Sequence, residues 1–225
     1  MIEIDELQGA HFRLPHAAVM PGELVAVVAP SLACAREFVD LVLGLTEPRR
    51  GSVKLFGQTL SAADEPAALR LRAKLGFAGQ GDGLVSHLAL SENILLGAAY
   101  HRQARAAGVD DRVRTLLNWC GWSEAEARRA FALQPAEATP FERSVAAWLR
   151  ALLGEPDLLV CENLFQGLDA GQRRRLIDAS VNFLAENPRR GSVFVLVGDA
   201  LVEELQPTAM FYLSLHGDFR AESQL

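Results

Sequence analysis

The sequence PGELVAVVAPSLACAREFVDLVLGL, residues 21–45, decides how the rest of the chain is interpreted. Its uninterrupted apolar run at residues 24–28 predicts a buried strand. A short segment at residues 29–34 follows, and after it Phe38, Leu41, Val42 and Leu45 recur on one helical face. The stretch therefore predicts a strand, a tight connection and an amphipathic helix.

A strand, a tight connection and a helix in this order form the framework of a P-loop. The consensus GxxxxGK[ST] uses glycine so that backbone N–H groups close around phosphate, lysine for the β- and γ-phosphates, and a hydroxyl for Mg²⁺. Here the corresponding places hold Ala29, Cys34, Ala35 and Arg36. The framework is present, and the side chains that bind phosphate and metal are missing.

The start of the helix differs from that of a phosphate-binding loop. From Ser31 onward no glycine occurs before Gly44, and Ser31 is a residue type that caps helix N-termini. We therefore expect the helix to begin early and to fill the phosphate nest. Glu37 adds negative charge where a helix N-terminus would otherwise favour an anion. In an alternative interpretation Arg36 replaces the lysine from one position later.

Composition limits the classes of function. The chain has 225 residues, half of them hydrophobic, which suits one large α/β domain. Its net charge of -6 argues against a general nucleic-acid binder. Cys34, Cys120 and Cys161 lack the spacing of a zinc site and are expected to be buried, reduced thiols. No apolar run of membrane-spanning length and no signal peptide are evident, so we expect a cytoplasmic protein.

The remaining pattern alternates strands and helices. Two short strands, at residues 2–7 and 12–19, the second broken by Pro15, predict a small antiparallel layer. Residues 90–133 have a helical pattern, a helix at 142–153 stops at Gly154, and we interpret this region as a helical subdomain. The other expected elements are strands at 52–56, 158–161, 193–197 and 210–215, helices at 66–75 and 170–187, and a short apolar segment at 75–78 before a glycine-rich loop.

Over nearly its whole length the chain resembles the nucleotide-binding ATPase subunit of an ABC transporter. The resemblance lies in PGELVAVV, GLTEPRRGSVKLFG, GLVSHLALSENILL, RALLGEPDLLV and FQGLDAGQRRRLI, in order and spacing. The stretch GDGLVSHLALSENI is most similar to the ATPases of bacterial Mce-type lipid transporters. The resemblance implies a P-loop NTPase-like α/β fold with a mainly parallel core sheet, a small N-terminal antiparallel layer, and a helical subdomain at about 90–153 between core parts 1–89 and 154–225.

The resemblance also implies a role for each matching position. In the P-loop, Leu32 and Cys34 put side chains where the family has glycine. Glu162 stands at the acidic position that holds Mg²⁺ and remains a possible metal ligand. Asn163 stands at the place of the general base, but an amide has no proton affinity near neutral pH. Gly198 stands at the place of the histidine that senses the γ-phosphate, so we expect no catalytic residue.

The family signature LSGGQ falls on residues 138–142, which read ATPFE. Its glycines normally offer N–H groups to a γ-phosphate on the opposite subunit. Pro140 has no N–H group, and Phe141 is bulky. Thr139, Pro140 and Glu142 instead spell a capping box with proline at the first helical position. We expect this helix to satisfy its own free donors.

Surface-contact features of the family survive. Gln80 is placed like the Q-loop glutamine, and Leu168 with Asp169 like the dimer-contacting D-loop. The alternative is a polar turn at Gln80 and a helix N-cap at Asp169. No aromatic residue in the short connection between residues 7 and 12 is an obvious partner for adenine. The aromatic residues more easily interpreted as core or interface are Tyr100, Trp119, Trp122 and Trp148.

The resemblance, together with the substituted motif residues, suggests a degenerate ABC transporter subunit that has lost ATP binding and hydrolysis. We expect no cofactor, no nucleic-acid partner, and contacts with a transmembrane permease, a second ATPase subunit or a second copy, peripheral at the inner face of the membrane. The alternative is a divergent, active ATPase that uses Mg-ATP to move a hydrophobic or lipid-like substrate. A third hypothesis is a soluble regulator or scaffold outside transport.

Overall fold

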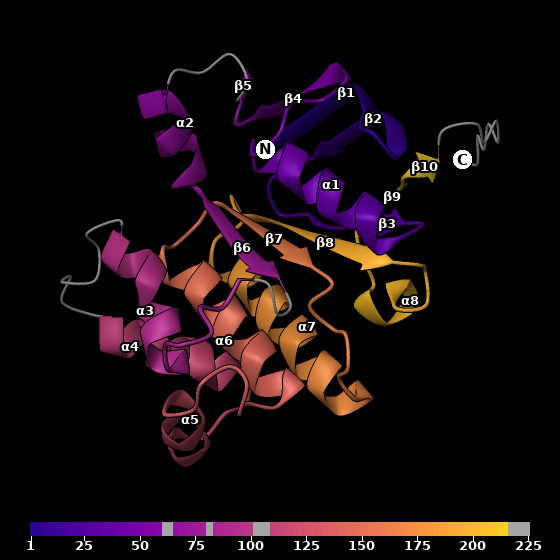
Figure 1. Ribbon diagram of the computed structural model, residues 1–225. Coiled ribbons are helices and arrows are strands. Elements are labelled where there is room, and N and C mark those ends of the chain that lie inside the picture. The colour runs from indigo at the N-terminus through magenta and orange to yellow at the C-terminus, as the bar shows by residue number, and fades with distance from the viewer. Residues whose placement is uncertain (60–64, 80–82, 101–108, 216–225) are drawn as a thin grey trace.

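Two five-stranded sheets form the framework of the computed structural model, which describes residues 1–59, 65–79, 83–100 and 109–215 (Figure 1). The strands are β1 (Ile2–Gln8), β2 (Phe12–Val19), β3 (Leu24–Ala29), β4 (Arg50–Leu55), β5 (Gln58–Thr59), β6 (Leu75–Gly79), β7 (Leu158–Glu162), β8 (Gly191–Val197), β9 (Ala209–Tyr212) and β10 (Ser214–Leu215). The helices are α1 (Leu32–Val42), α2 (Glu65–Arg72), α3 (Leu90–Tyr100), α4 (Val109–Trp119), α5 (Glu124–Phe131), α6 (Pro140–Leu153), α7 (Ala170–Glu186) and α8 (Val202–Leu205).

The core sheet is parallel, with strand order β6-β7-β8-β3-β9. All six residues of β3 are buried, as expected for a strand that is covered on both faces. The register places Ala29 beside Val197, and Glu162 beside Val195. The carboxyl ends of β3, β7 and β8 therefore meet at one edge of the sheet, where ligands bind in open α/β sheets.

Helices cover both faces of the parallel sheet. In Figure 1, α1 lies between the two sheets, while α6 and α7 lie on the opposite side of the parallel sheet. One hydrophobic core joins α1 to both sheets through residues such as Phe38, Leu55 and Val195. The other core joins the parallel sheet to α3, α4, α6 and α7 around the fully buried Trp148. The expected α/β fold with a parallel sheet, a small antiparallel sheet and helices is confirmed.

The antiparallel sheet has the order β10-β2-β1-β4-β5. The expectation that Pro15 breaks the second strand is wrong, because β2 continues through it. The register passes from the pair Leu7–Leu14 to the pair Asp5–His16, so Pro15 lies opposite Glu6, whose φ is 47°. Proline lacks an N–H group, and it is tolerated where the ladder is already irregular.

The last expected strand, at residues 210–215, is two strands in different sheets. β9 pairs in parallel with β3, and β10 pairs antiparallel with β2. Leu213 lies between them and is buried. The apolar pattern predicts extended backbone here but contains no signal for the change of sheet. The division into a helical subdomain at 90–153 and two core parts stays a prediction.

Candidate functional site

The P-loop segment is closed by its own hydrogen bonds. Ser31 is the N-cap of α1, and its Oγ accepts a hydrogen bond from the Cys34 N–H at 3.3 Å. The Ala35 N–H donates to the Ser31 carbonyl at 3.0 Å, as in a regular helix. Two amides that a phosphate-binding loop would direct at its ligand are therefore used inside the protein. The prediction that α1 begins early is confirmed.

The side chains of this segment do not form a phosphate cradle. Cys34 and Ala35 are buried, so the position of the family's lysine faces the core. Leu32 is 57% exposed and presents an apolar side chain to solvent beside the loop. The three cysteines are free and buried, as expected, and burial raises the pKa of the Cys161 thiol.

Arg36 and Glu162 join α1 to the end of β7. The Arg36 Nη1 donates a hydrogen bond to Glu162 Oε2 at 3.0 Å, and the Arg36 Nε lies 3.8 Å from Asp40 Oδ1. Only 6% of the Glu162 side chain is exposed, whereas 45% of the Arg36 side chain is exposed. A guanidinium thus neutralises the one carboxylate at this edge that was a candidate for Mg²⁺. In the described part of the chain, no group of three or more histidine, cysteine or acidic residues could hold a metal ion.

Glu37 is bound by the turn between β1 and β2, which also contacts Cys34 near the start of α1. Its carboxylate accepts hydrogen bonds from the N–H groups of Ala10 and His11 and from the His11 Nδ1 at 3.0 Å. Burial would raise the pKa of Glu37, but the donors at Ala10 and His11 outweigh it and lower the pKa. A Cβ on Gly9 would lie 2.7 Å from this carboxylate, so a larger residue there would displace the Glu37 side chain from its present contacts.

The places of the catalytic base and the sensor histidine lie at the adjoining strand ends. The Asn163 N–H donates to the Val195 carbonyl at 3.0 Å, and its side-chain amide donates to Gln166 Oε1 at 2.7 Å. The Gly198 N–H donates to the Ala29 carbonyl at 3.0 Å, with a φ of 73°. The structure thus brings together the P-loop and Gly198, and neither Asn163 nor Gly198 offers a group that accepts a proton near neutral pH.

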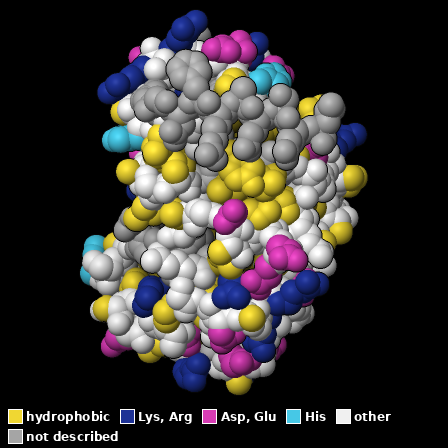
Figure 2. Space-filling model, turned by 90° about the vertical axis from the view of Figure 1, so that its right-hand side faces the viewer, with side chains coloured by type: hydrophobic (Ala, Val, Ile, Leu, Met, Phe, Trp, Pro, Cys, Tyr) yellow, Lys and Arg dark blue, Asp and Glu magenta, His cyan; other side chains and the backbone are white. Residues whose placement is uncertain are grey.

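The surface at this end of the molecule carries apolar side chains. Figure 2 looks onto the side where α1, α8 and β9 lie and shows a continuous group of hydrophobic side chains next to acidic ones. Exposed hydrophobic residues on elements that reach this side include Leu32, Val197, Met210 and Tyr212. Leu32, Val197 and Met210 cannot donate the hydrogen bonds that a bound phosphate needs, and of these four side chains only Tyr212 carries a donor.

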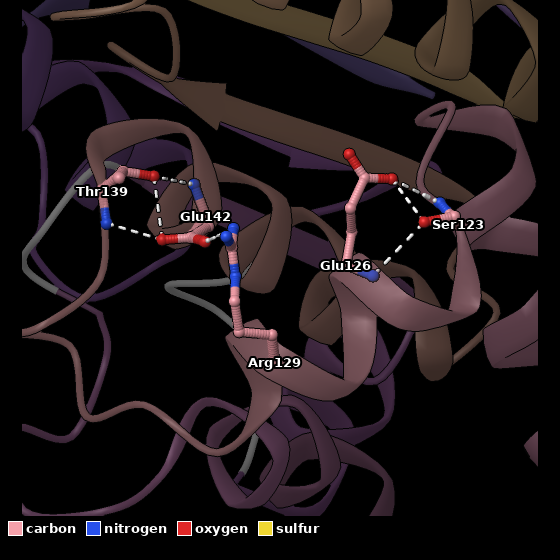
Figure 3. A network of polar contacts seen from close by, with 5 residues as sticks. All are labelled: Ser123, Glu126, Arg129, Thr139 and Glu142. Atoms are coloured by element: carbon pink, nitrogen blue, oxygen red, sulfur yellow. Dashed lines mark hydrogen bonds and ion pairs between the residues drawn. The ribbon is translucent and has the colours of Figure 1, made fainter.

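The capping box at α6 is formed as the sequence predicts (Figure 3). Thr139 Oγ1 accepts from the Glu142 N–H at 3.3 Å, and Glu142 Oε2 accepts from the Thr139 N–H at 2.8 Å. Arg129 of α5 donates to Glu142 Oε1 at 3.0 Å. Burial would raise the pKa of Glu142, but the hydrogen bonds from Thr139 and Arg129 outweigh it and lower the pKa.

Phe141, the bulky residue of the motif, lies inside the protein. It is only 7% exposed, and its ring packs edge-on against Trp122 at 6.0 Å between centroids. At the first turn of α6 this side chain points toward the helical core, where Trp122 in the connection between α4 and α5 is its apolar partner. Pro140, which lacks an N–H group, remains the partly exposed residue of the motif.

Of the remaining residues with a predicted role, some lie where expected and others do not. Asp169 is the N-cap of α7 and forms a capping box with Gln172. Leu168 is 6% exposed, so the expectation that its side chain belongs to a contact surface is wrong. Trp148 and Trp122 are core residues, and Trp119 packs against Trp148. Gln80 lies outside the described residues, and the side chain of Tyr100 is not described either.

Solved structures with this fold are ABC transporter cassettes. The dimeric structure of an ATP-binding cassette in a post-hydrolysis state with ADP and Pi aligns with a TM-score of 0.77 and 19% identity, covering 95% of this chain and 94% of that one. An ATP-binding subunit of an ABC transporter aligns with a TM-score of 0.74 and 22% identity, covering 95% and 86%. At these identities the likeness shows the fold alone. No profile of a known protein family matches the chain.

Curated relatives add a sequence relationship. A sulfate/thiosulfate import ATP-binding protein of Nephroselmis olivacea is 32% identical over 158 residues, 70% of this chain and 43% of that protein. A methionine import ATP-binding protein of Paraburkholderia xenovorans is 30% identical over 151 residues, which are 67% of this chain and 38% of that protein. The chain belongs to the ABC transporter ATP-binding proteins. The matched stretch spans less than half the length of each relative.

The residues at this edge of the sheet differ from those with which an ABC transporter ATP-binding protein holds Mg-ATP. A cassette needs free loop amides and a cation for the phosphates, and an acid for the metal. Here Cys34 and Ala35 donate their amides within α1, and the Glu162 carboxylate is bonded to Arg36. No described helix is long and apolar enough to cross a membrane.

Proposed function

We propose that this ABC transporter subunit has lost Mg-ATP binding and hydrolysis and acts through protein contacts. The observation that carries the proposal is the hydrogen-bonded ion pair between Arg36 and Glu162. It joins the residue at the place of the metal-binding hydroxyl to the residue at the place of the metal-binding acid. An internal cation therefore supplies the charge that Mg²⁺ would bring.

Three further features support the proposal. The helix α1 closes over the loop amides, Asn163 replaces the catalytic base, and the signature helix caps itself with Thr139 and Glu142. Phosphoryl transfer depends on preorganised positive charge around the phosphates and on a positioned base. Losing these groups together removes most of that stabilisation, in both halves of a shared nucleotide site.

The partner class follows from the family. The chain has the cassette fold and belongs to the ABC transporter ATP-binding proteins, so a contact with a transmembrane permease or another ATPase subunit at the inner face of the membrane is the proposed arrangement. A transported substrate is not part of the proposal, because the relatives are named for different imported solutes.

Calorimetric titration with Mg-ATP tests the proposal. The natural chain should give no saturable heat up to about 1 mM nucleotide. The matched variant carries Leu32→Gly, Cys34→Gly, Ala35→Lys and Arg36→Ser together, and it should gain measurable affinity because it regains open amides, a lysine and a hydroxyl. Micromolar affinity of the natural chain, or ATP turnover that Glu162→Gln abolishes, would establish the divergent active ATPase instead.

A further inference from the structure

A pocket lies away from the P-loop, between α5 and the first turns of α6 and α7. Its volume is about 420 Å³. This falls within the range of about 300–1,000 Å³ that is usual for small-molecule sites. The lining residues are Trp122, Glu126, Arg129, Thr139, Phe141, Glu142, Asp169, Gly171, Gln172 and Arg175. Apart from two aromatic rings and one glycine, the lining is polar or charged.

The acidic residues of the pocket are already engaged by helix caps. Glu126 Oε2 accepts hydrogen bonds from the Ser123 N–H at 2.8 Å and from the Ser123 hydroxyl at 2.7 Å (Figure 3). Glu142 is held by Thr139 and Arg129, and Asp169 Oδ1 accepts from the Gln172 N–H at 2.9 Å. Hydrogen bonds within the protein therefore orient these carboxylates.

Arg175 is the basic residue of the pocket without such a partner. Within the described ranges of the chain, its guanidinium makes no hydrogen bond and no ion pair. Its charge acts on the nearby Glu126 carboxyl, whose pKa is lowered by the hydrogen bonds from Ser123 and, to a smaller extent, by Arg175. Its Cδ and Nε would lie 3.8 Å from a Cβ at Gly121, so the side chain extends along the turn between α4 and α5. Arg129 bonds to Glu142 through Nη2. The pocket therefore offers a planar, charged donor group beside a second arginine.

We propose that this pocket binds a small hydrophilic carboxylate, with its carboxylate on Arg175 and its hydroxyl or amino groups toward the outer oxygens of Glu126 and Asp169. A guanidinium and a carboxylate form paired, charge-assisted hydrogen bonds. A doubly charged phosphate would meet stronger repulsion from the three neighbouring acids than a singly charged carboxylate does. The rings of Trp122 and Phe141 form the apolar part of the wall.

This site is independent of nucleotide binding. Its donors are arginine side chains of α5 and α7, whereas the amides at the start of α6 are capped by Thr139. Binding of the carboxylate would thus occur whether or not the subunit hydrolyses ATP. The ion pair between Arg129 and Glu142 joins α5 to α6, and Arg175 belongs to α7. A bound carboxylate would therefore contact three helices.

Titration of the full chain with L-lactate, D-glycerate and L-glutamate tests the site, with inorganic phosphate and Mg-ATP as comparators. Tryptophan fluorescence, to which Trp122 contributes with two other tryptophans, detects binding, and calorimetry gives the affinity. We expect saturable binding of at least one carboxylate. Arg175→Gln should weaken it by at least about tenfold, the loss of a charge-assisted contact. Arg128→Gln, a neighbouring arginine outside this pocket, is the matched control and should bind normally.

Three results would overturn the proposal. The first is no saturable binding of any of the three carboxylates up to about 10 mM, a concentration at which even a very weak site fills appreciably. The second is equal affinity of the natural chain and Arg175→Gln, which would place the carboxylate elsewhere. The third is tighter binding of phosphate or Mg-ATP than of every carboxylate, which would assign the pocket to phosphate chemistry.

Discussion

Arg36 and Glu37 are adjacent on α1, and they hold this helix to two different sheets. Arg36 bonds to Glu162 at the end of β7 in the parallel sheet. Glu37 bonds to the turn between β1 and β2 in the antiparallel sheet. Both contacts join residues that are far apart in the sequence. Two consecutive charged residues therefore position the N-terminal half of α1 from both sides.

Arg36→Ala should destabilise the protein by about 1–2 kcal/mol, because it leaves the buried Glu162 carboxylate without its cation. We expect a contribution at the lower end of that usual for hydrogen bonds to charged groups, because the Arg36 side chain is nearly half exposed to solvent. Urea denaturation measures the change. Arg189→Ala, at an exposed arginine, is the control and should be neutral. Equal stability of Arg36→Ala and the natural chain would contradict the structural role of the pair.

Glu142 should make the stability of the fold depend on acidic pH. Its pKa in the folded protein is below its ordinary value of 4.5, so the unfolded chain binds the proton more tightly. The stabilisation is therefore complete above the unfolded pKa and is lost as the pH falls through the folded pKa. When the pH is lowered from about 6 to about 4, the free energy of unfolding should fall less for Glu142→Gln than for the natural chain. Urea denaturation at both pH values gives the change in the free energy of unfolding for each protein. An equal change in the variant and in the natural chain would contradict the expectation.

At the scale of the element, α5, α6 and α7 each begin with a reciprocal capping box. The caps are Ser123 with Glu126, Thr139 with Glu142, and Asp169 with Gln172. Each box satisfies two free donors of the first turn within the chain itself. For α6 this replaces a role that the family assigns to a phosphate from the opposite subunit, and it makes the start of the helix independent of a ligand.

Thr139→Ala should destabilise the protein by about 1 kcal/mol, the usual cost of removing an N-cap side chain. Thr139→Ser keeps the hydroxyl and should stay close to the natural stability. Thermal and urea denaturation of the two variants separate the lost hydrogen bond from the lost methyl group. If both variants lost the same stability, the cap would not be the cause.

Local sequence patterns predicted most elements and both caps at Thr139 and Asp169, because these depend on residues within one helical turn of each other. The tie between Glu37 and residues 10–11 could not be predicted, since it joins segments more than twenty positions apart. The burial of Phe141 depends on Trp122 of a neighbouring segment. The sequence also contained no sign that Leu168 is buried, because only the packed structure shows which apolar side chains the core encloses.

At the scale of the whole molecule, the proposed loss of nucleotide binding affects assembly. In the resembling family each ATP lies between the P-loop of one subunit and the signature of the other. Here one half of such a site presents Leu32 and Arg36, and the other presents Pro140 without an N–H group. Pairing with an intact subunit should therefore restore neither half.

The oligomeric state should be unchanged by Mg-ATP, for the chain alone or with a partner. Light scattering with and without nucleotide measures this directly. A hydrolysis-deficient intact cassette that dimerises with ATP serves as the positive control. An ATP-dependent shift from monomer to dimer that is lost on Phe141→Gly or Glu162→Gln would refute the expectation and the proposed loss of nucleotide binding together.

The place of β3 in the parallel sheet has a consequence for the order of events during synthesis. Its two neighbours are β8 and β9, so Leu24 pairs with Ser192 and Val25 with Ala209. At about 5–20 residues per second, a ribosome needs roughly ten to thirty seconds to make the roughly 170 residues between β3 and β8. During this interval the six apolar residues of β3 have no native strand to pair with, and an unpaired apolar edge is prone to aggregation. The nascent chain therefore has to be shielded, by early packing of α1 or by a chaperone, until its last strands emerge.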